Sequence, residues 1–281
     1  MIISIASGKG GTGKTTVATN LASSLESDVK FLDCDVEEPN AHLFVNPVMY
    51  KKETITTTVP EIDESKCNLC GKCIDICQFK AIVRIADIIL PFTDLCHSCG
   101  GCMEVCPEGA ISWSVRELGI IEKGHKNNIE FIHGRLRVGE AMSPPLIKKV
   151  RQYAGGNGLT IIDAPPGTSC PVIAAMKNAD FIILVTEPTP FGLHDLKLAA
   201  GAVKLLNIPC GIIINRSDMG DDGVKEFVKE ENIPILMDIP FDRRIAESYS
   251  RGELVVDNIP EWKEKYINLY EKIEKLVQEN H

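Results

Sequence analysis

The sequence predicts an α/β protein with a predominantly parallel, doubly wound sheet and a small α+β insertion. Apolar strand-like segments alternate with amphipathic helical segments along most of the 281 residues. A glycine-rich turn separates the first strand from the first helix, and eight of the eleven cysteines fall between Cys67 and Cys106. We therefore expect an α/β domain formed by residues 1–58 and 114–281, and an inserted domain at residues 59–113.

The elements of the α/β domain follow from apolar periodicity. A strand at Ile2–Ser7 precedes a helix at residues 14–25, and the cysteine-rich segment separates this opening from the rest. Further strands are expected at residues 29–36, 159–163, 179–188, 210–217 and 233–240, and helices at 191–207, 222–232 and 260–278. The last helix carries one apolar stripe, formed by Trp262, Tyr266, Leu269, Ile273 and Leu276.

Composition narrows the class of partner and the compartment. The formal net charge of −9 disfavours a nucleic acid held by bulk charge. No apolar run approaches the roughly 20 residues of a membrane span, and no signal peptide opens the chain. The sequence therefore predicts a cytoplasmic protein with no nucleic-acid partner and no stable membrane insertion.

The first loop has the pattern of a phosphate-binding site. Gly8–Thr15 reads G-x-x-x-x-G-K-T between the first strand and the first helix, the context that this motif requires. Backbone N–H groups of such a loop and the helix N-terminus bind phosphate, Lys14 reaches the β- and γ-phosphates, and the Thr15 hydroxyl binds Mg²⁺. The predicted ATP- or ADP-binding residues of the loop are Gly8, Lys9, Gly10, Gly11, Thr12, Gly13, Lys14, Thr15 and Thr16.

The cysteine segment repeats itself at an offset of 29 residues. C-x₂-C-x₂-C-x₃-C occurs twice, which is the spacing of bacterial two-cluster ferredoxins, in which the fourth cysteine of each run binds the other cluster. The spacing therefore predicts two [4Fe–4S] sites, one formed by Cys67, Cys70, Cys73 and Cys106 and the other by Cys77, Cys96, Cys99 and Cys102. Zinc and disulfides are the alternatives, but structural zinc sites use paired rather than tripled cysteines, and disulfides are rare in the cytosol.

Three further observations concern single residues in and beyond this segment. Gln78 stands where the second copy has Pro107, so the cluster bound by Cys77 is expected to differ from its neighbour in potential or lability. Cys34 and Cys210 lie in strands and are expected to be core thiols. Cys170 is expected to be a packed thiol, with weak metal or persulfide binding near a dimer interface as the alternative.

Several segments together resemble one family of ATPases. "KGGTGKTT" is similar to the deviant phosphate loop of the ParA, MinD, Mrp and nitrogenase-iron-protein group; "DCDVEEPN" (33–40) and "DAPPGTS" (163–169) resemble its two switches. "INR" (214–216) and "IPFD" (239–242) resemble its adenine pocket, with Asn215 as a base contact. The resemblance implies an ATP-sandwich homodimer, or a heterodimer with a related ATPase. In it Lys9 reaches the partner's nucleotide, Asp35 positions the attacking water and Asp163 holds Mg²⁺ through water.

Together these features predict an ATPase in which Lys9, Lys14 and Asp35 are catalytic. We expect ATP to gate electron transfer or cluster handling toward a redox or iron–sulfur acceptor protein, with ATP or ADP, Mg²⁺ and two [4Fe–4S] clusters as ligands. The alternatives are a cluster scaffold or carrier resembling Mrp, and a positioning ATPase resembling MinD or ParA with structural clusters.

Overall fold

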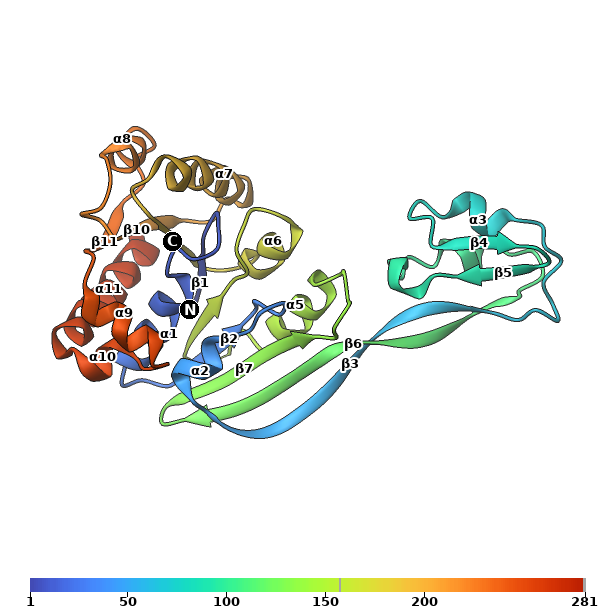
Figure 1. The fold of residues 1–281 in the computed structure, drawn as a ribbon, viewed down its shortest axis with the longest axis horizontal. Coiled ribbons are helices and arrows are strands. Elements are labelled where there is room, and N and C mark those ends of the chain that lie inside the picture. The colour runs from blue at the N-terminus through green and yellow to red at the C-terminus, as the bar shows by residue number, and fades with distance from the viewer. Residues whose placement is uncertain (157, 280–281) are drawn as a thin grey trace.

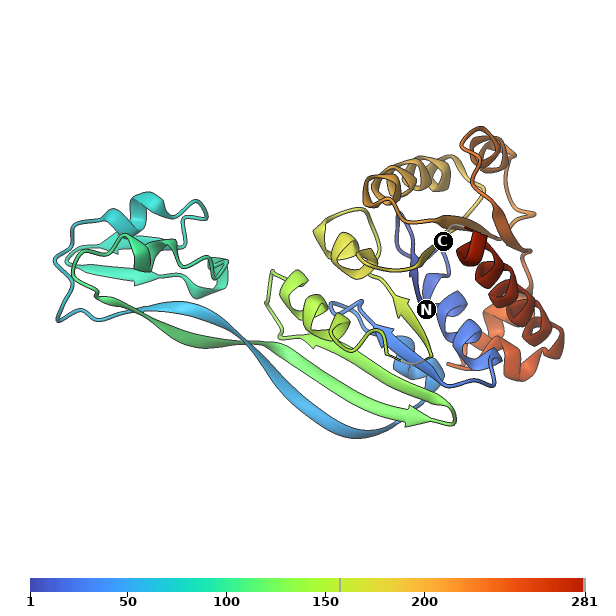
Figure 2. The same cartoon turned by 180° about the vertical axis from the view of Figure 1, so that it is seen from behind.

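The structure, a computed structural model, describes residues 1–156 and 158–279. A large α/β body lies at one end, and a small cysteine-bearing part lies at the far end of two long strands (Figure 1). The view from behind shows the same separation (Figure 2). We call residues 63–110 the cysteine module, and the two strands that carry it, β3 (Val48–Ile62) and β6 (Ile111–Lys126), the ribbon. The remaining residues form the body.

The body is built on a sheet whose strand order is β11-β10-β9-β1-β8-β2-β7-β6-β3. Its strands from β11 to β7 pair in parallel, whereas β6 and β3 are antiparallel additions at one edge. The parallel strands are β1 (Ile2–Ala6), β2 (Val29–Asp33), β7 (Ile129–Leu136), β8 (Leu159–Asp163), β9 (Phe181–Thr186), β10 (Cys210–Asn215) and β11 (Ile235–Ile239). Because β1 lies between β8 and β9, the order in which the chain adds strands to the sheet reverses there. At such a point α/β folds bind ligands, at the carboxyl ends of the strands.

Helices cover both faces of this sheet, so most strands are buried on two sides. One face packs against α1 (Lys14–Ser24), α2 (Ala41–Val45), α9 (Arg243–Ser250), α10 (Val255–Asn258) and α11 (Pro260–Glu279). The other packs against α5 (Pro144–Arg151), α6 (Cys170–Met176), α7 (Pro190–Leu206) and α8 (Gly223–Glu230). Two continuous apolar layers result, and burial on both sides explains the near-continuous apolar strands of the sequence.

The ribbon leaves the sheet at a defined position. Gly119 of β6 pairs with Leu136 at the end of β7, and before residue 119 the strand β6 pairs only with β3 in the described residues. The β3–β6 register shifts between Ile55 and Thr56, directly opposite this point. The ribbon therefore changes at one level from part of a twisted sheet to a free two-stranded segment.

The cysteine module is compact and has a small apolar core of its own. It contains α3 (Lys72–Ile76), the hairpin β4 (Ile82–Ile85) and β5 (Ile88–Pro91), the short 3₁₀ helix η1 (Thr93–Leu95) and α4 (Gly101–Glu104). Gly71 and Gly100, 29 residues apart, adopt the same left-handed conformation before α3 and α4. The sequence repeat is thus also a structural repeat.

The parallel α/β class predicted from the sequence is confirmed, and so is the last helix. In that helix Val277 is buried and Leu276 is only partly buried, a shift of one position at the end of the predicted stripe. The sequence reasoning did not find β3, β6 or β7. The predicted boundaries at 58/59 and 113/114 fall inside β3 and β6, which continue through them, and the division into domains stays a prediction. No described helix is both long and apolar enough to cross a membrane.

Candidate functional site

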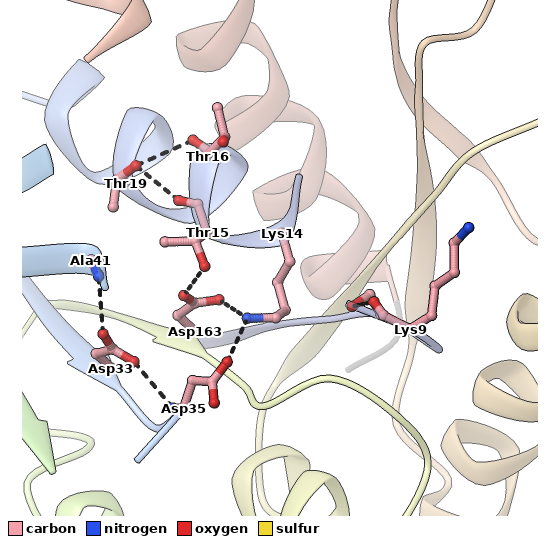
Figure 3. A network of polar contacts seen from close by, with 10 residues as sticks. Lys9, Lys14, Thr15, Thr16, Thr19, Asp33, Asp35, Ala41 and Asp163 are labelled. Carbon is pink, nitrogen blue, oxygen red and sulfur yellow. Dashed lines mark hydrogen bonds and ion pairs between the residues drawn. The ribbon is translucent and has the colours of Figure 1, made fainter. Parts of the chain in front are cut away.

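The glycine-rich loop brings a lysine and a buried carboxylate together at the carboxyl edge of the sheet. Gly13, with φ 95°, ends the loop and places Lys14 and Thr15 in the first turn of α1. Lys14 Nζ donates to Asp163 Oδ1 at 2.7 Å, and Thr15 Oγ1 donates to Asp163 Oδ2 at 2.7 Å (Figure 3). The Asp163 side chain is fully buried, so its charge is balanced mainly by Lys14. The loop and the end of β8 therefore form one charged cluster.

Two acidic residues after β2 complete this cluster in different ways. Asp33 is fully buried and accepts hydrogen bonds from the backbone N–H groups of Asp35 and Ala41, both at 3.1 Å. Burial and the charge of Asp163 raise the pKa of Asp33 well above its ordinary value. Asp35 Oδ2 lies 4.0 Å from Lys14 Nζ, and burial raises the pKa of Asp35 to about 6 although Lys14 opposes the shift. Asp33 thus fixes the turn after β2, while Asp35 faces the open side of the cluster.

Lys14 itself carries a stabilised positive charge. Burial alone would lower the pKa of this ammonium group, but the charges of Asp163 and Asp35 outweigh burial and raise it. A cation held at the start of a helix, next to exposed loop N–H groups, is suited to binding the phosphates of a nucleoside triphosphate.

The second loop lysine points elsewhere. Lys9 Nζ lies 3.5 Å from Glu187 Oε2, and Arg216 Nη1 lies 2.9 Å from Glu187 Oε1. Figure 3 shows Lys9 directed away from Lys14 and Asp163. Within this chain, therefore, Lys9 is paired outside the Lys14 cluster. The sequence reasoning did not find Glu187, and the acidic residue at the end of the predicted strand 179–188 was the available signal.

A cavity of about 440 Å³ opens beside the loop. Its lining includes two groups of residues, Gly10, Gly11, Gly13, Lys14, Thr15 and Thr16 of the loop and α1, and Asn215, Arg216, Phe241 and Tyr249 of later segments. Asn215 Nδ2 donates to the backbone oxygen of Thr12 at 2.8 Å, and a Cβ at Gly13 would lie 2.5 Å from that amide nitrogen. The cavity is large enough for a nucleotide, and the predicted base contact Asn215 lies directly against the phosphate loop.

The eight clustered cysteines line two separate small cavities of the cysteine module. Cys67, Cys70, Cys73 and Cys106 line one, together with Ile62, Ile89 and Ile111. Cys77, Cys96, Cys99 and Cys102 line the other, together with Phe79, His97 and Trp113. The structure therefore groups the cysteines in the two crossed sets that the spacing predicts.

Backbone N–H groups point at several of these sulfurs. Ala81 N–H donates to Cys77 Sγ and Ala110 N–H to Cys106 Sγ, both at 3.3 Å, and Ser98 N–H donates to Cys96 Sγ at 3.4 Å. The first two bonds are equivalent in the repeat, so this contact does not distinguish the copy with Gln78 from the copy with Pro107. Within the described ranges, no group of three or more histidine, cysteine or acidic side chains is arranged around a single metal ion.

One of the three remaining thiols differs in exposure from the expectation. Cys34 is fully buried beside Asp33, where burial raises its pKa, and Cys210 is half-buried in β10, in agreement with core thiols. Cys170, expected to be packed, is exposed at the first residue of α6. The short helix begins at the surface after the loop that follows Asp163, so Cys170 is exposed although Val172 in the same turn is buried in the core.

Comparison with known proteins agrees with this geometry. Residues 3–255 match the CobQ/CobB/MinD/ParA nucleotide binding domain. An uncharacterized protein of Methanocaldococcus jannaschii is 35% identical over 285 residues, covering 99% of this chain and 98% of its own length. An iron-sulfur cluster carrier protein of Aquifex aeolicus is 26% identical and covers 92% of this chain and 63% of its own length.

The fold resembles solved structures of the same group. The septum site-determining protein MinD of Pyrococcus horikoshii, complexed with Mg-ADP, superposes with a TM-score of 0.61 at 23% identity and covers 98% of this chain and 96% of its own. The family match spans the phosphate loop, both acidic strand ends and the ribbon. The chain therefore belongs to the CobQ/CobB/MinD/ParA family of nucleotide-binding domains and has the α/β P-loop fold of MinD.

Proposed function

We propose that this protein binds and hydrolyses ATP and uses the nucleotide state to control an iron–sulfur module. In the ATP site, Lys14 neutralises the β- and γ-phosphates, and Asp35, at the open side of the cluster, orients the attacking water. Thr15 and Asp163 supply the oxygen ligands that suit Mg²⁺, Asp163 through water. The contacts among Lys14, Thr15 and Asp163 support these roles because all three groups already converge on one point.

The cysteine module fits two [4Fe–4S] clusters. The donor set is four thiols in each of two cavities, and backbone N–H groups donate to the sulfurs, as in proteins that stabilise cluster thiolates. A cubane has ligands on four corners, so its cysteines need not surround a single point as they do for one zinc ion. When bound, such clusters supply one-electron transfer.

The observation that carries this proposal is the pairing of two independent sites in one chain. A charged phosphate loop lies in the body, and two crossed cysteine sets lie in a module joined to it by the ribbon (Figures 1 and 2). Movement of the module on the ribbon would bring its clusters to a redox or iron–sulfur acceptor protein. A homodimer, or a heterodimer with a related ATPase, would close over the nucleotide face, and Lys9 would exchange Glu187 for the partner's phosphates.

Anaerobic purification tests the ligand part of the proposal. We expect about eight irons and eight sulfides per chain, and Mg²⁺-dependent hydrolysis of ATP that is lost in Lys14→Ala. A chain with one or two zinc ions and no sulfide would refute the cluster assignment, and an unchanged rate in the variant would refute the ATP site.

A cluster carrier is the second candidate, and a specific observation favours it. Three relatives that are 24% to 26% identical to this chain have the name iron-sulfur cluster carrier protein. The exposed Cys70 and Cys99, one in each cysteine set, would give an acceptor's thiols access to both sites. Transfer of iron and sulfide from the loaded protein to an apo-ferredoxin would support this candidate, and clusters that stay bound through many turnovers of ATP would exclude it.

A further inference from the structure

Within the residues that the structure describes, one side chain of the cysteine module contacts both the body and the ribbon strand β6. Asp94 of η1 accepts a hydrogen bond from Arg137 Nη2 at 2.8 Å. Arg137 lies in the loop between β7 and α5, so this contact joins the module to the body directly rather than along the ribbon. Asp94 also lies 3.4 Å from Arg116 Nη1 of β6. One carboxylate thus bridges two guanidinium groups from different segments.

Arg116 is held by a buried partner, whereas Asp94 is exposed. Arg116 pairs with Glu140, whose side chain is fully buried, and Glu140 also accepts from the backbone N–H of Met142 at 3.0 Å. Asp94, by contrast, has 65% of its side chain exposed. The Nε atoms of Arg116 and Arg137 are buried without a hydrogen-bond partner. The docked arrangement therefore leaves donors unsatisfied, which lowers the cost of undocking.

The ribbon provides a place where the module can turn. Beyond Gly119 the ribbon has only two strands, and such a ribbon has little stability of its own. The bulge between Ile55 and Thr56 lies at the same level, and bulges bend the strand that carries them. Gly119 is required there, because a Cβ would lie 2.3 Å from the backbone oxygen of Arg135.

A packed path links the same loop to the nucleotide site. The loop that contains Arg137 leads into α5, which contacts α6, and Leu146 and Val150 of α5 share one core cluster with Val172 and Met176 of α6. Arg151, at the end of α5, donates to the backbone oxygen of Lys177, which caps α6. Helix α6 begins seven residues after Asp163, directly beyond the loop that a bound γ-phosphate would contact.

We propose that Asp94, Arg116, Arg137 and Glu140 form a latch that fixes the orientation of the cysteine module. Nucleotide binding opens or closes this latch through the loop after Asp163, α6 and α5. The nucleotide part of the inference rests on the proposed function, whereas the latch itself does not. Because the latch consists of ion pairs with one exposed partner, added salt weakens it.

Distance measurements by pulsed electron paramagnetic resonance test the latch. Eleven cysteines rule out thiol labels, so spin-labelled non-natural amino acids are placed at the exposed Glu64 of the module and Lys149 of α5. The clusters are kept oxidised. We expect a narrow distance distribution for the wild type and for Asp87→Ala, since the ion pair of Asp87 in the described residues lies within the module, with Arg84 at 3.6 Å. In Asp94→Ala we expect the undocked population to rise about fivefold, and Asp94→Glu should restore part of the docking.

Two comparisons make the outcome decisive. Identical distributions for Asp94→Ala, Asp87→Ala and the wild type would overturn the latch. With the latch shown, a non-hydrolysable ATP analogue with Mg²⁺ should shift the wild-type distribution relative to ADP and leave Asp94→Ala unchanged; no shift in the wild type would overturn the nucleotide route. Iron content and nucleotide binding are measured on the same samples, and they report whether the proposed function fails. The comparison of Asp94→Ala with Asp87→Ala is made without nucleotide, so it tests the latch independently of that result.

Discussion

Replacing Lys14 by methionine should destabilise the body in a strongly pH-dependent way. Methionine keeps the length and apolar stem of the side chain but removes the charge that lies 2.7 Å from Asp163 and 4.0 Å from Asp35. Asp163 and Asp33, which are fully buried neighbours in the β2–β8 register, then lose their common cation. Removing one partner of a buried ion pair costs about 3–5 kcal/mol, and we expect this loss in nucleotide-free protein at pH 8.

The sign of the pH dependence follows from the direction of the carboxyl pKa values. Burial raises the pKa of Asp33 well above its ordinary range and that of Asp35 to about 6, and Lys14 opposes both shifts. These groups bind a proton more tightly in the folded than in the unfolded chain, so protonation favours folding. Without Lys14 the pKa values of these carboxyl groups rise further. Each additional pKa unit offsets about 1.4 kcal/mol of the lost stability once the group is protonated. The destabilisation should therefore shrink as the pH falls from 8 toward 5.

Urea unfolding followed by Trp262 fluorescence measures this effect. Trp262 is buried in the body, and Trp113→Phe removes the other tryptophan. Lys9→Met is the matched control: its pair with Glu187 is one-third exposed on the lysine side, so we expect a loss of about 1 kcal/mol or less with little pH dependence. A loss below about 1 kcal/mol in Lys14→Met, or one that is equal at pH 8 and pH 5, would show that Lys14 does not balance the buried carboxylates.

Three further substitutions, and a control at Cys170, test single residues of the two sites. Asp35→Asn should lower the rate of ATP hydrolysis about 100-fold or more with unchanged affinity for ADP. The wild-type rate should fall below about pH 6, where Asp35 is protonated. A full rate in the variant would contradict the water-orienting role. Asn215→Ala removes the contact with Thr12 and should weaken ADP binding about 5- to 10-fold by calorimetry, whereas equal affinity would leave Asn215 without a role in the site. Cys77→Ser should halve the iron content from about eight to about four per chain, while Cys170→Ser, at an exposed thiol, should leave it unchanged; loss of all iron in Cys77→Ser or any loss in Cys170→Ser would argue against the crossed sets.

The parts of the fold that could be predicted are those encoded by neighbouring residues. Strands β1, β2, β8, β9 and β10 are continuous apolar runs because helices bury both of their faces, and the loop from Gly8 to Thr15 is a contiguous motif. The four cysteines that line each small cavity are the ones that the ferredoxin spacing assigns to one set, and their role as cluster ligands stays a prediction.

The ribbon could not be predicted in the same way. Most of β3 is solvent-exposed, so its residues show little apolar alternation, and its partner β6 begins 49 residues after β3 ends. A propensity signal was present in the β-branched run Thr54–Val59, but only pairing across the cysteine module turns it into a strand. Likewise, Asp94 and Arg137 lie 43 residues apart, and Lys9 and Glu187 lie 178 apart, so only the folded chain brings these charges together.

The central claim is that the nucleotide in the body controls the cysteine module, and a redox titration tests it most directly. The anaerobic, cluster-loaded protein is titrated with dithionite under electron paramagnetic resonance, with no nucleotide, with Mg-ADP and with Mg²⁺ and a non-hydrolysable ATP analogue. We expect two reducible [4Fe–4S] centres whose signal or midpoint potential differs between the ADP and ATP-analogue samples. Identical signals and potentials in all three states, in protein that binds the nucleotides, would contradict it.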